Sequence, residues 1–230
     1  MKNLIYHLYP EKTKFDFHLK YLLENKNKFD GEKLICLSLE ENENVYKYEE
    51  IEHHFKDFKL IRVQNNPHIR ESISFFNNLL PYILDVEGIT FFGHSKSNSV
   101  KRLRFEYSKP HTTWTRLLYE KNLENIGDVE EKLLNYNYTS YGSFLRQSLL
   151  EPIPSCKWHY SGTFFWFNNK KLKKSSDKIN SYIYKTNRWG VEGFLGSILP
   201  VEQSYCHFNI DGDLGLPIQD NKIHPLNNYF

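Results

Sequence analysis

The amino-acid sequence predicts an α/β fold in which a mostly parallel central sheet is flanked by helices. Apolar, strand-like runs alternate with segments whose apolar residues recur at helical spacing. The strands are expected at residues 4–9, 33–39, 58–63 and 89–92, and the helices between them at residues 15–25, 48–55 and 69–84. The turn Asn65-Asn66-Pro67 closes the third strand. Four strands separated by three helices indicate parallel strands joined by right-handed crossovers.

The second half of the chain is patterned less regularly. A basic stretch at residues 97–111 is expected to form a loop. A buried aromatic strand is expected at 164–167 and a short strand at 206–210, because aromatic side chains favour strands. Helices are expected at residues 113–122, 128–136, 143–150 and 170–185, and a Gly-rich turn that opens a short helix at 189–196. No internal repeat divides the chain, so we expect a single domain over residues 1–230.

Composition restricts the classes of partner. The formal net charge of the 230 residues is only +2, so bulk electrostatics do not favour binding to nucleic acid. The cysteines, Cys36, Cys156 and Cys206, form no C-x-x-C pair, which argues against a disulfide framework or a zinc site and predicts a reducing, cytoplasmic location. No secretion signal is recognisable, and no apolar run approaches the roughly 18 residues of a membrane-spanning helix. The lysine-rich residues 170–174 fit either a solvated helix face or a contact with an acidic membrane surface.

The residues from Trp158 to Asn168 are the most informative stretch. Six aromatic side chains and His159 surround a Ser161-Gly162 break. Glycine has no Cβ and allows close approach to the backbone. The stretch therefore fits an aromatic pocket for a flat or ring-shaped ligand, and it also fits a core strand that carries no site.

Two shorter strings add candidate polar groups. Gly93-His94-Ser95-Lys96 follows the fourth strand, where Lys96 and the loop amides could hold a phosphate, although a solvated loop fits as well. Glu192 follows Trp189-Gly190 and fits either a general base or a carboxylate at the positive end of a helix. The sequence contains neither a G-x-S-x-G hydrolase elbow nor a G-x-G-x-x-G dinucleotide motif.

The order of these strings resembles a group of bacterial and viral glycosyltransferase-like proteins linked to capsule or lipopolysaccharide synthesis. Over residues 4–200 the chain supplies, in the order typical of that group, Tyr6-His7, Asn65-Asn66 before Glu71 and Phe75, His94-Ser95-Lys96, Trp114 with Tyr119, the string from His159 to Trp166, and Gly190-Val191-Glu192. The string from His159 to Trp166 is the most specific of them. The resemblance implies a fold of the glycosyltransferase A type, with a nucleotide-binding half at residues 1–96 and a half for acceptor and donor sugar at 97–230. It also implies a nucleotide-sugar donor, a glycan or other hydroxyl acceptor, and a location in the bacterial cytoplasm or in that of a virus host.

The same resemblance implies roles for individual residues. The implied contacts to nucleotide and diphosphate are Tyr6, His7, Asn65, His94 and Lys96. The implied contacts to donor sugar and acceptor are Trp158, His159, Ser161, Gly162, Thr163 and Trp166. Glu192 would take the proton from the acceptor hydroxyl if the enzyme inverts the anomeric centre, whereas a retaining enzyme would not need this base.

Two departures from the pattern bear on the metal. Ser97 stands where the group has glycine. Most enzymes of this fold carry Asp-x-Asp at the end of the fourth strand to hold Mn²⁺ or Mg²⁺ on the diphosphate, and this chain has Gly93-His94-Ser95-Lys96 there. The sequence leaves open whether Lys96 replaces the metal as a fixed cation or whether His94 and His207 help to bind one. His207 with Asp211 and Asp213 fits a Mn-type site or an ordinary surface turn.

Two other functions stay open from the sequence. A non-catalytic carbohydrate-binding relic of the same fold would explain the missing Asp-x-Asp, whereas Glu192 and Lys96 argue against it. A nucleic-acid-binding protein would use the basic residues 101–109 with the aromatic strand, and the near-neutral net charge argues against that function.

Overall fold

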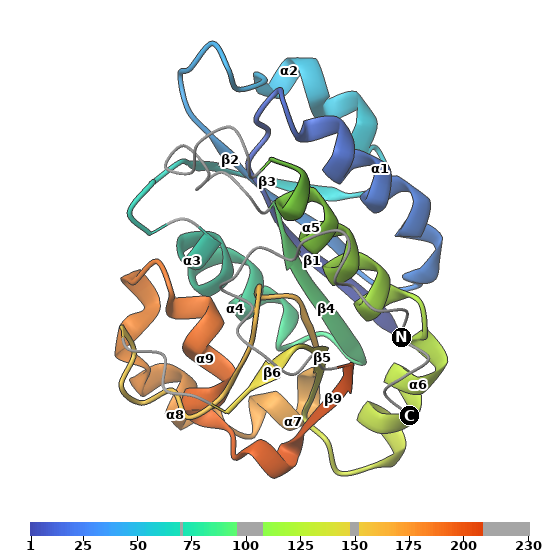
Figure 1. Ribbon diagram of the computed structural model, residues 1–230, viewed down its shortest axis with the longest axis vertical. Helices are drawn as coiled ribbons and strands as arrows, with labels where there is room; N and C mark the ends of the chain where they lie inside the picture. The colour runs from blue at the N-terminus through green and yellow to red at the C-terminus, as the bar shows by residue number, and fades with distance from the viewer. Residues whose placement is uncertain (70, 96–107, 148–151, 209–230) are drawn as a thin grey trace.

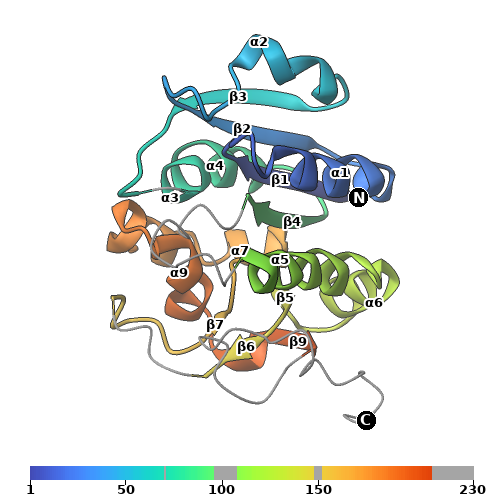
Figure 2. The same ribbon diagram turned by 45° about the horizontal axis from the view of Figure 1, so that its top comes forward.

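A seven-stranded sheet forms the centre of the computed structural model, which describes residues 1–69, 71–95, 108–147 and 152–208 (Figure 1). The strand order is β3-β2-β1-β4-β8-β5-β9. The strands are β1 (Lys2–Leu8), β2 (Lys33–Leu39), β3 (Lys59–Gln64), β4 (Ile89–His94), β5 (Ser140–Ser143), β8 (Phe165–Asn168) and β9 (Ser204–Phe208), while β6 (Leu145–Arg146) and β7 (His159–Tyr160) form a separate two-stranded ribbon. Figure 2 shows β3, β2, β1 and β4 following one another from its top.

One strand of this sheet runs against the other six. β1 pairs in parallel with β2 and with β4, and β2 pairs in parallel with β3. β8 lies between β4 and β5 and is antiparallel to both, whereas β9 is parallel to β5. The predicted α/β fold with a mostly parallel sheet is therefore confirmed, and the carboxyl ends of β1 to β4 meet at one edge of the sheet.

Helices cover both faces of the sheet. They are α1 (Phe15–Asn25), η1 (Lys26–Lys28), α2 (Tyr48–Ile51), η2 (Glu52–Phe55), α3 (Glu71–Ser74), η3 (Phe75–Leu79), α4 (Leu80–Ile83), α5 (Ser108–Leu123), α6 (Ile126–Glu130), η6 (Glu131–Asn135), α7 (Asn169–Lys173), α8 (Ser176–Ser181), η7 (Ile183–Thr186), α9 (Gly190–Ile198) and η8 (Val201–Gln203). In the described ranges, no helix combines the length and the apolar character that crossing a membrane requires.

The alternation of side chains along the strands creates two cores. Leu4, Tyr6 and Leu8 of β1 join one buried cluster with α1, α5 and α6, which we call the α5 face. Ile5 joins the other cluster with η3, α4 and α9, which we call the α9 face. The same alternation holds in the aromatic stretch around β8, where Phe164 and Trp166 belong to the first cluster and Phe165 and Phe167 to the second. Figure 1 shows the helices of these two faces on opposite sides of β1 and β4.

Three predicted elements of the second half were wrong. Residues 143–147 do not begin a helix: Ser143 ends β5, Phe144 has a positive φ of 60°, and β6 follows. Backbone pairing of β5 with β8 and β9 overrides the local helix-forming residues here. The helix expected at 170–185 is divided into α7, α8 and η7, because Ser175 and Tyr182 interrupt it. In the loop expected at 97–111, residues 108–111 are helical, and the rest lies outside the described residues.

Candidate functional site

Two histidines lie side by side at the carboxyl ends of β1 and β4. His7 and His94 are register partners on these strands, and both are buried on the α9 face. The ring of His7 bonds through Nδ1 to the Ser74 hydroxyl at 2.8 Å. Burial lowers the pKa of His7 to about 4; the carboxylate of Glu71 opposes the shift and His94 adds to it. His7 is therefore neutral at neutral pH.

The turn from Ser161 to Thr163 lies directly against His94. The Nε2–H of His94 donates to the Gly162 carbonyl at 3.1 Å. Gly162 and Thr163 both have positive φ angles, 92° and 61°. A β-branched residue in this region is strained, so the turn is held by its surroundings rather than by local preference. Such strain is concentrated at functional sites in proteins, and here it falls on a string that the sequence singled out.

Glu192 contacts the other side of the same turn. The Gly162 N–H donates to Glu192 Oε1 at 3.4 Å, the one hydrogen bond of this carboxylate within the described ranges. Glu192 is half-buried in the first turn of α9, where the helix dipole favours an acidic side chain. His94, the turn and Glu192 therefore form one connected group, although they come from three separate parts of the chain.

Close packing of α9 places Glu192 there. Gly190, Gly193 and Gly196 recur every three residues and form one face of the helix. A Cβ on Gly196 would lie 1.6 Å from the Trp158 carbonyl oxygen, and one on Gly190 would lie 2.3 Å from the Tyr184 oxygen. This glycine spacing was the sequence signal for a tightly packed helix, whereas the sequence analysis predicted a Gly-rich turn that opens a short helix.

A second polar group lies at the ends of β1, β2 and β3. The Tyr9 hydroxyl donates to Glu40 Oε1 at 2.6 Å, and Asn65 Nδ2 donates to Glu40 Oε2 at 2.5 Å. The Ser38 hydroxyl donates to Asn65 Oδ1 at 3.1 Å. Burial and the neighbouring Glu40 carboxylate raise the pKa of the Tyr9 hydroxyl. Sequence reasoning named Asn65 but missed Glu40, whose only signal was its place directly after a strand.

The two polar groups are joined through Ser95. Its hydroxyl accepts the Tyr9 N–H at 2.7 Å, and its own N–H donates to the His7 carbonyl at 2.9 Å. Polar side chains thus follow the carboxyl edge from β3 to β4. This is where open α/β sheets bind ligands.

Several predicted site residues lie in the cores instead of at this edge. Tyr6 is on the α5 face, where its hydroxyl bonds to Tyr119 and to His18 Nδ1. The indole N–H groups of Trp158 and Trp166 donate to the backbone carbonyls of Leu199 and Asn122, and neither ring has appreciable exposure. His159 is also buried, on β7. Lys96 lies outside the described residues.

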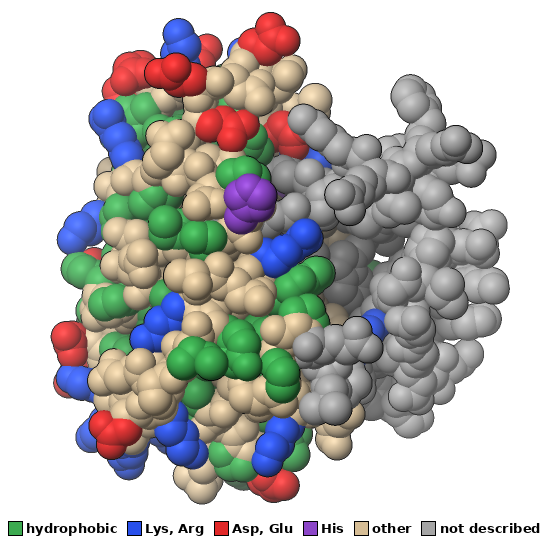
Figure 3. All heavy atoms as spheres, turned by 90° about the vertical axis from the view of Figure 1, so that its left-hand side faces the viewer, with side chains coloured by type: hydrophobic (Ala, Val, Ile, Leu, Met, Phe, Trp, Pro, Cys, Tyr) green, Lys and Arg blue, Asp and Glu red, His purple; other side chains and the backbone are tan. Residues whose placement is uncertain are grey.

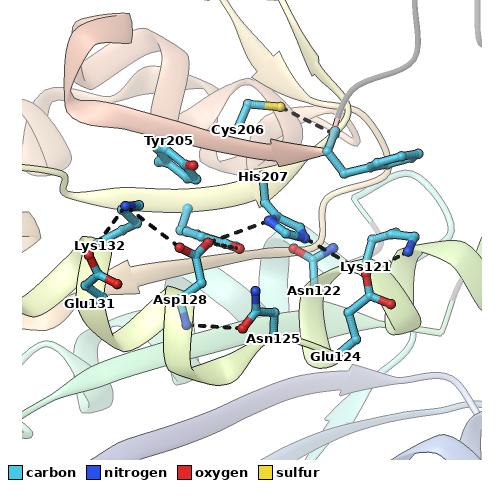
Figure 4. Close-up of polar contacts among 12 residues, drawn as sticks. Lys121, Asn122, Glu124, Asn125, Asp128, Glu131, Lys132, Tyr205, Cys206 and His207 are labelled. Atoms are coloured by element: carbon cyan, nitrogen blue, oxygen red, sulfur yellow. Dashed lines mark hydrogen bonds and ion pairs between the residues drawn. The ribbon is translucent and has the colours of Figure 1, made fainter. Parts of the chain in front are cut away.

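His207 belongs to a different part of the molecule. It lies on β9, three strands from β4 in the sheet, and its ring stacks on Tyr141. Figure 4 shows His207 between Asp128 and Glu124. Its Nδ1 is 3.6 Å from Asp128 Oδ2, and its Nε2 is 3.9 Å from Glu124 Oε1. Asp128 also accepts the Tyr141 hydroxyl at 2.8 Å and lies 3.8 Å from Lys132. His94 and His207 are therefore not brought together.

The described residues contain no set of ligands that matches the predicted divalent metal. No three His, Cys, Asp or Glu side chains gather there in a way that could hold a metal ion. Asp211 and Asp213 lie outside the described residues. A role for Mn²⁺ or Mg²⁺ stays a prediction from the resemblance, and no chemical step is assigned to it here.

Comparison with known proteins gives little sequence evidence. No family model matches the chain, and no curated protein matches it. Among solved structures, the chain is similar to a candidate nucleotide-diphospho-sugar transferase from Desulfovibrio desulfuricans G20, with 8% sequence identity and a TM-score of 0.46. The alignment covers 91% of this chain and 82% of that protein. At this level of similarity the match does not determine the function of this chain.

Proposed function

We propose that the protein transfers a sugar from a nucleotide-diphosphate donor to a hydroxyl acceptor. The observation that supports this is the connected group of His94, the strained turn at Gly162, and Glu192 at the carboxyl edge of the parallel strands. These residues come from the same strings on which the resemblance rests. A half-buried carboxylate with one long hydrogen bond remains available to a substrate hydroxyl.

The donor would lie along the polar edge. Asn65 can donate or accept hydrogen bonds to the nucleoside and Glu40 can accept them. Lys96, the next residue in the sequence after Ser95, would supply a positive charge for the diphosphate. The backbone of Gly162, without a side chain, allows the donor sugar to approach the turn beside His94. His7, neutral because burial lowers its pKa, adds no charge of its own that would compete with Lys96.

Glu192 would remove the proton from the acceptor hydroxyl as that oxygen attacks the anomeric carbon. The proton moves to the carboxylate, the new glycosidic bond forms, and the nucleoside diphosphate leaves with the electron pair of the bond to the sugar. This assignment applies to an inverting reaction. Tyr6, Trp158 and Trp166 would support the edge from behind, because their rings are buried in the two cores.

Ligand binding should be measured first. We expect one nucleotide class among UDP, GDP, CMP and their sugars, each with and without Mn²⁺, to raise the melting temperature, since a ligand that binds the folded state stabilises it by mass action. Glu192→Gln should keep this shift and lower turnover by about 10²- to 10⁴-fold, the usual contribution of a positioned base. The exposed Glu202, on η8, provides the matched control as Glu202→Gln.

The outcomes separate the candidate functions. Absence of any shift with all nucleotide sugars would refute the proposal. Binding without turnover in the unmodified protein would instead assign a carbohydrate-binding role without catalysis. Full turnover in Glu192→Gln would remove this residue from the reaction.

A further inference from the structure

Positive charge is dense in residues 169–189, as it is in the basic stretch at 97–111. Residues 169–189 contain seven Lys and Arg residues and a single acid, Asp177. The whole chain has 30 basic and 28 acidic residues, which leaves 23 basic and 27 acidic residues elsewhere. The net charge of +2 therefore hides a strongly basic segment at 169–189, which the excess of acidic residues elsewhere offsets.

This segment forms α7, α8 and η7, and most of its charges face solvent. Lys170, Lys174, Lys178 and Arg188 are exposed, and Lys185 is partly exposed. Lys178 and Lys185 donate only to backbone carbonyls, those of Ile198 and Asn180, so their charge is not neutralised by these contacts.

Two lysines of the segment are engaged elsewhere. Lys171 turns inward and donates to the carbonyls of Leu133, Tyr136 and Tyr138. Lys173 pairs with Asp85 at 2.6 Å. The free positive charge of the segment is therefore carried by Lys170, Lys174, Lys178, Lys185 and Arg188.

An exposed apolar side chain projects from the same segment. Ile183 is 78% exposed, the largest value among the exposed large hydrophobic residues of the described ranges. Its neighbour Tyr182 is buried, and the Tyr182 hydroxyl donates to the Gly190 carbonyl at 2.7 Å. Because Tyr182 anchors the turn, Ile183 is held outward rather than left free to fold back onto the core.

The surroundings complete an amphipathic surface. The Arg188 guanidinium lies 4.7 Å from the centre of the Trp189 ring, which is partly buried. Figure 3 shows this side of the molecule, with hydrophobic side chains bordered by Lys and Arg in its lower half and acidic side chains gathered at its top. Scattered acidic side chains also lie in the lower half, but they do not form a patch.

We propose that Lys170, Lys174, Lys178, Ile183, Lys185 and Arg188 form a docking surface for an anionic phospholipid bilayer. Exposed cations on the same segment as an exposed apolar side chain match the acidic headgroups and the hydrocarbon boundary beneath them. Ile183 favours a bilayer over a nucleic acid, because phosphate backbones offer nothing to bury an aliphatic side chain against. This inference does not depend on the proposed function.

The docking surface is connected to the candidate site through the chain that leads from η7 into α9. The Ser72 hydroxyl donates to the Asn187 carbonyl at 2.8 Å, which fixes the chain after η7 to α3. The chain then enters α9, which carries Glu192 in its first turn. The η7 end of the docking surface therefore lies next to the helix that carries Glu192, whereas Lys170 follows β8 beside the first residue of β4.

Vesicle sedimentation tests the proposal with the full chain. Vesicles of phosphatidylglycerol and phosphatidylcholine mixed at equal parts are compared with vesicles of phosphatidylcholine alone. We expect binding only to the anionic vesicles and release as salt rises, since salt screens exposed charges. Each Lys near such a surface contributes about fivefold in affinity, so Lys170→Gln with Lys174→Gln should weaken binding by about 25-fold.

Matched variants separate the docking surface from general charge effects. Lys20→Gln with Lys56→Gln removes the same charge from exposed positions on α1 and beside η2, and should leave binding unchanged within about twofold. Ile183→Ser should weaken binding, whereas Ile183→Leu should retain it, because only the first removes the apolar group.

Four results would overturn the proposal. They are no binding to the anionic vesicles, equal binding to phosphatidylcholine alone, equal weakening in the control double variant, and no effect of Ile183→Ser. If a poly(U) RNA competes with the vesicles and binds Ile183→Ser as tightly as the unmodified protein, the surface would be assigned to nucleic acid instead.

Discussion

His7 couples the candidate site to pH through its burial. The folded protein keeps this ring neutral down to a pKa of about 4, whereas the unfolded chain takes up the proton near the ordinary pKa of 6.5. Since the unfolded state binds more protons between these values, the free energy of unfolding should fall as pH drops through this window, by about 3 kcal/mol from His7 alone. Urea unfolding at pH 7, 5.5 and 4.5 measures the slope.

The test compares two histidine variants. His7→Asn should lower stability at pH 7 and flatten the acid dependence relative to the unmodified protein. His68→Asn, at an exposed position, should leave the slope unchanged. An unchanged slope in His7→Asn would show that the pKa of His7 is the same in the folded and unfolded states.

Gly162 has a backbone conformation that should make its substitution destabilising. Its φ of 92° is accessible to glycine and costly for other residues. Gly162→Ala should destabilise the fold by about 1–2 kcal/mol and reduce the melting shift caused by the donor, because the turn between His94 and Glu192 must move. Thr163→Gly, which relieves strain at the next position, should be at least as stable as Gly162→Ala in the same thermal melts. Equal stability of Gly162→Ala and the unmodified protein would contradict the geometry of the turn.

At single positions, the structure brings some of the residues named from the sequence together and separates others. The sequence analysis named His7, His94, Gly162 and Glu192, and the structure brings His94, Gly162 and Glu192 into one connected group, with His7 beside His94. It also placed Tyr6 with His7, although consecutive strand residues face opposite sides of a sheet. The burial of Trp158 and Trp166 could not be read locally, since an aromatic side chain is equally suited to a core and to a pocket wall.

Among the elements, α9 is the most sensitive to substitution. Gly196→Ala would place a Cβ 1.6 Å from a backbone oxygen that cannot move away easily. We expect a loss of about 3 kcal/mol or more in the free energy of unfolding, measured with urea, because overpacking against backbone forces the helix to shift. The same variant should also weaken turnover through displacement of Glu192.

Gly127 on α6 provides the control for a helical glycine. Nothing lies within 4 Å of a Cβ added there. Gly127→Ala should therefore stabilise the protein by up to about 1 kcal/mol, since alanine favours helix over glycine. A similar response of both positions would show that α9 packs less closely than described.

Elements were predictable where their partners are near in sequence. The helix at 15–25 and the strand at 33–39 agree with the structure to the residue. Residues 143–150 were predicted as a helix because the strand partners of Ser143, Leu145 and Arg146, in β9 and β7, lie further along the chain and leave no local signal. Strand pairing of this kind depends on tertiary packing rather than on propensity.

For the molecule as a whole, the sequence predicted the layers but not how the second half of the chain adds its strands to the sheet. The first four strands follow from alternation alone, as the parallel pairing of β3, β2, β1 and β4 confirms. The antiparallel insertion of β8 between β4 and β5 could not be predicted, because the direction of a strand is set by how the preceding chain returns to the sheet. The nucleotide and acceptor halves remain a prediction.

That insertion has a consequence for how the chain acquires its fold. β1 to β4 are complete once residue 94 has been made, but β4 keeps an open edge until β8 pairs with it, as Phe92 does with Phe165. An unpaired edge beside apolar residues invites association with other chains, and distant pairing is slow because a long loop must close first. The yield of refolding from urea should therefore fall as protein concentration rises. Light scattering at several concentrations would measure the aggregation. During synthesis on the ribosome, the edge of β4 would need protection until β8 has been made.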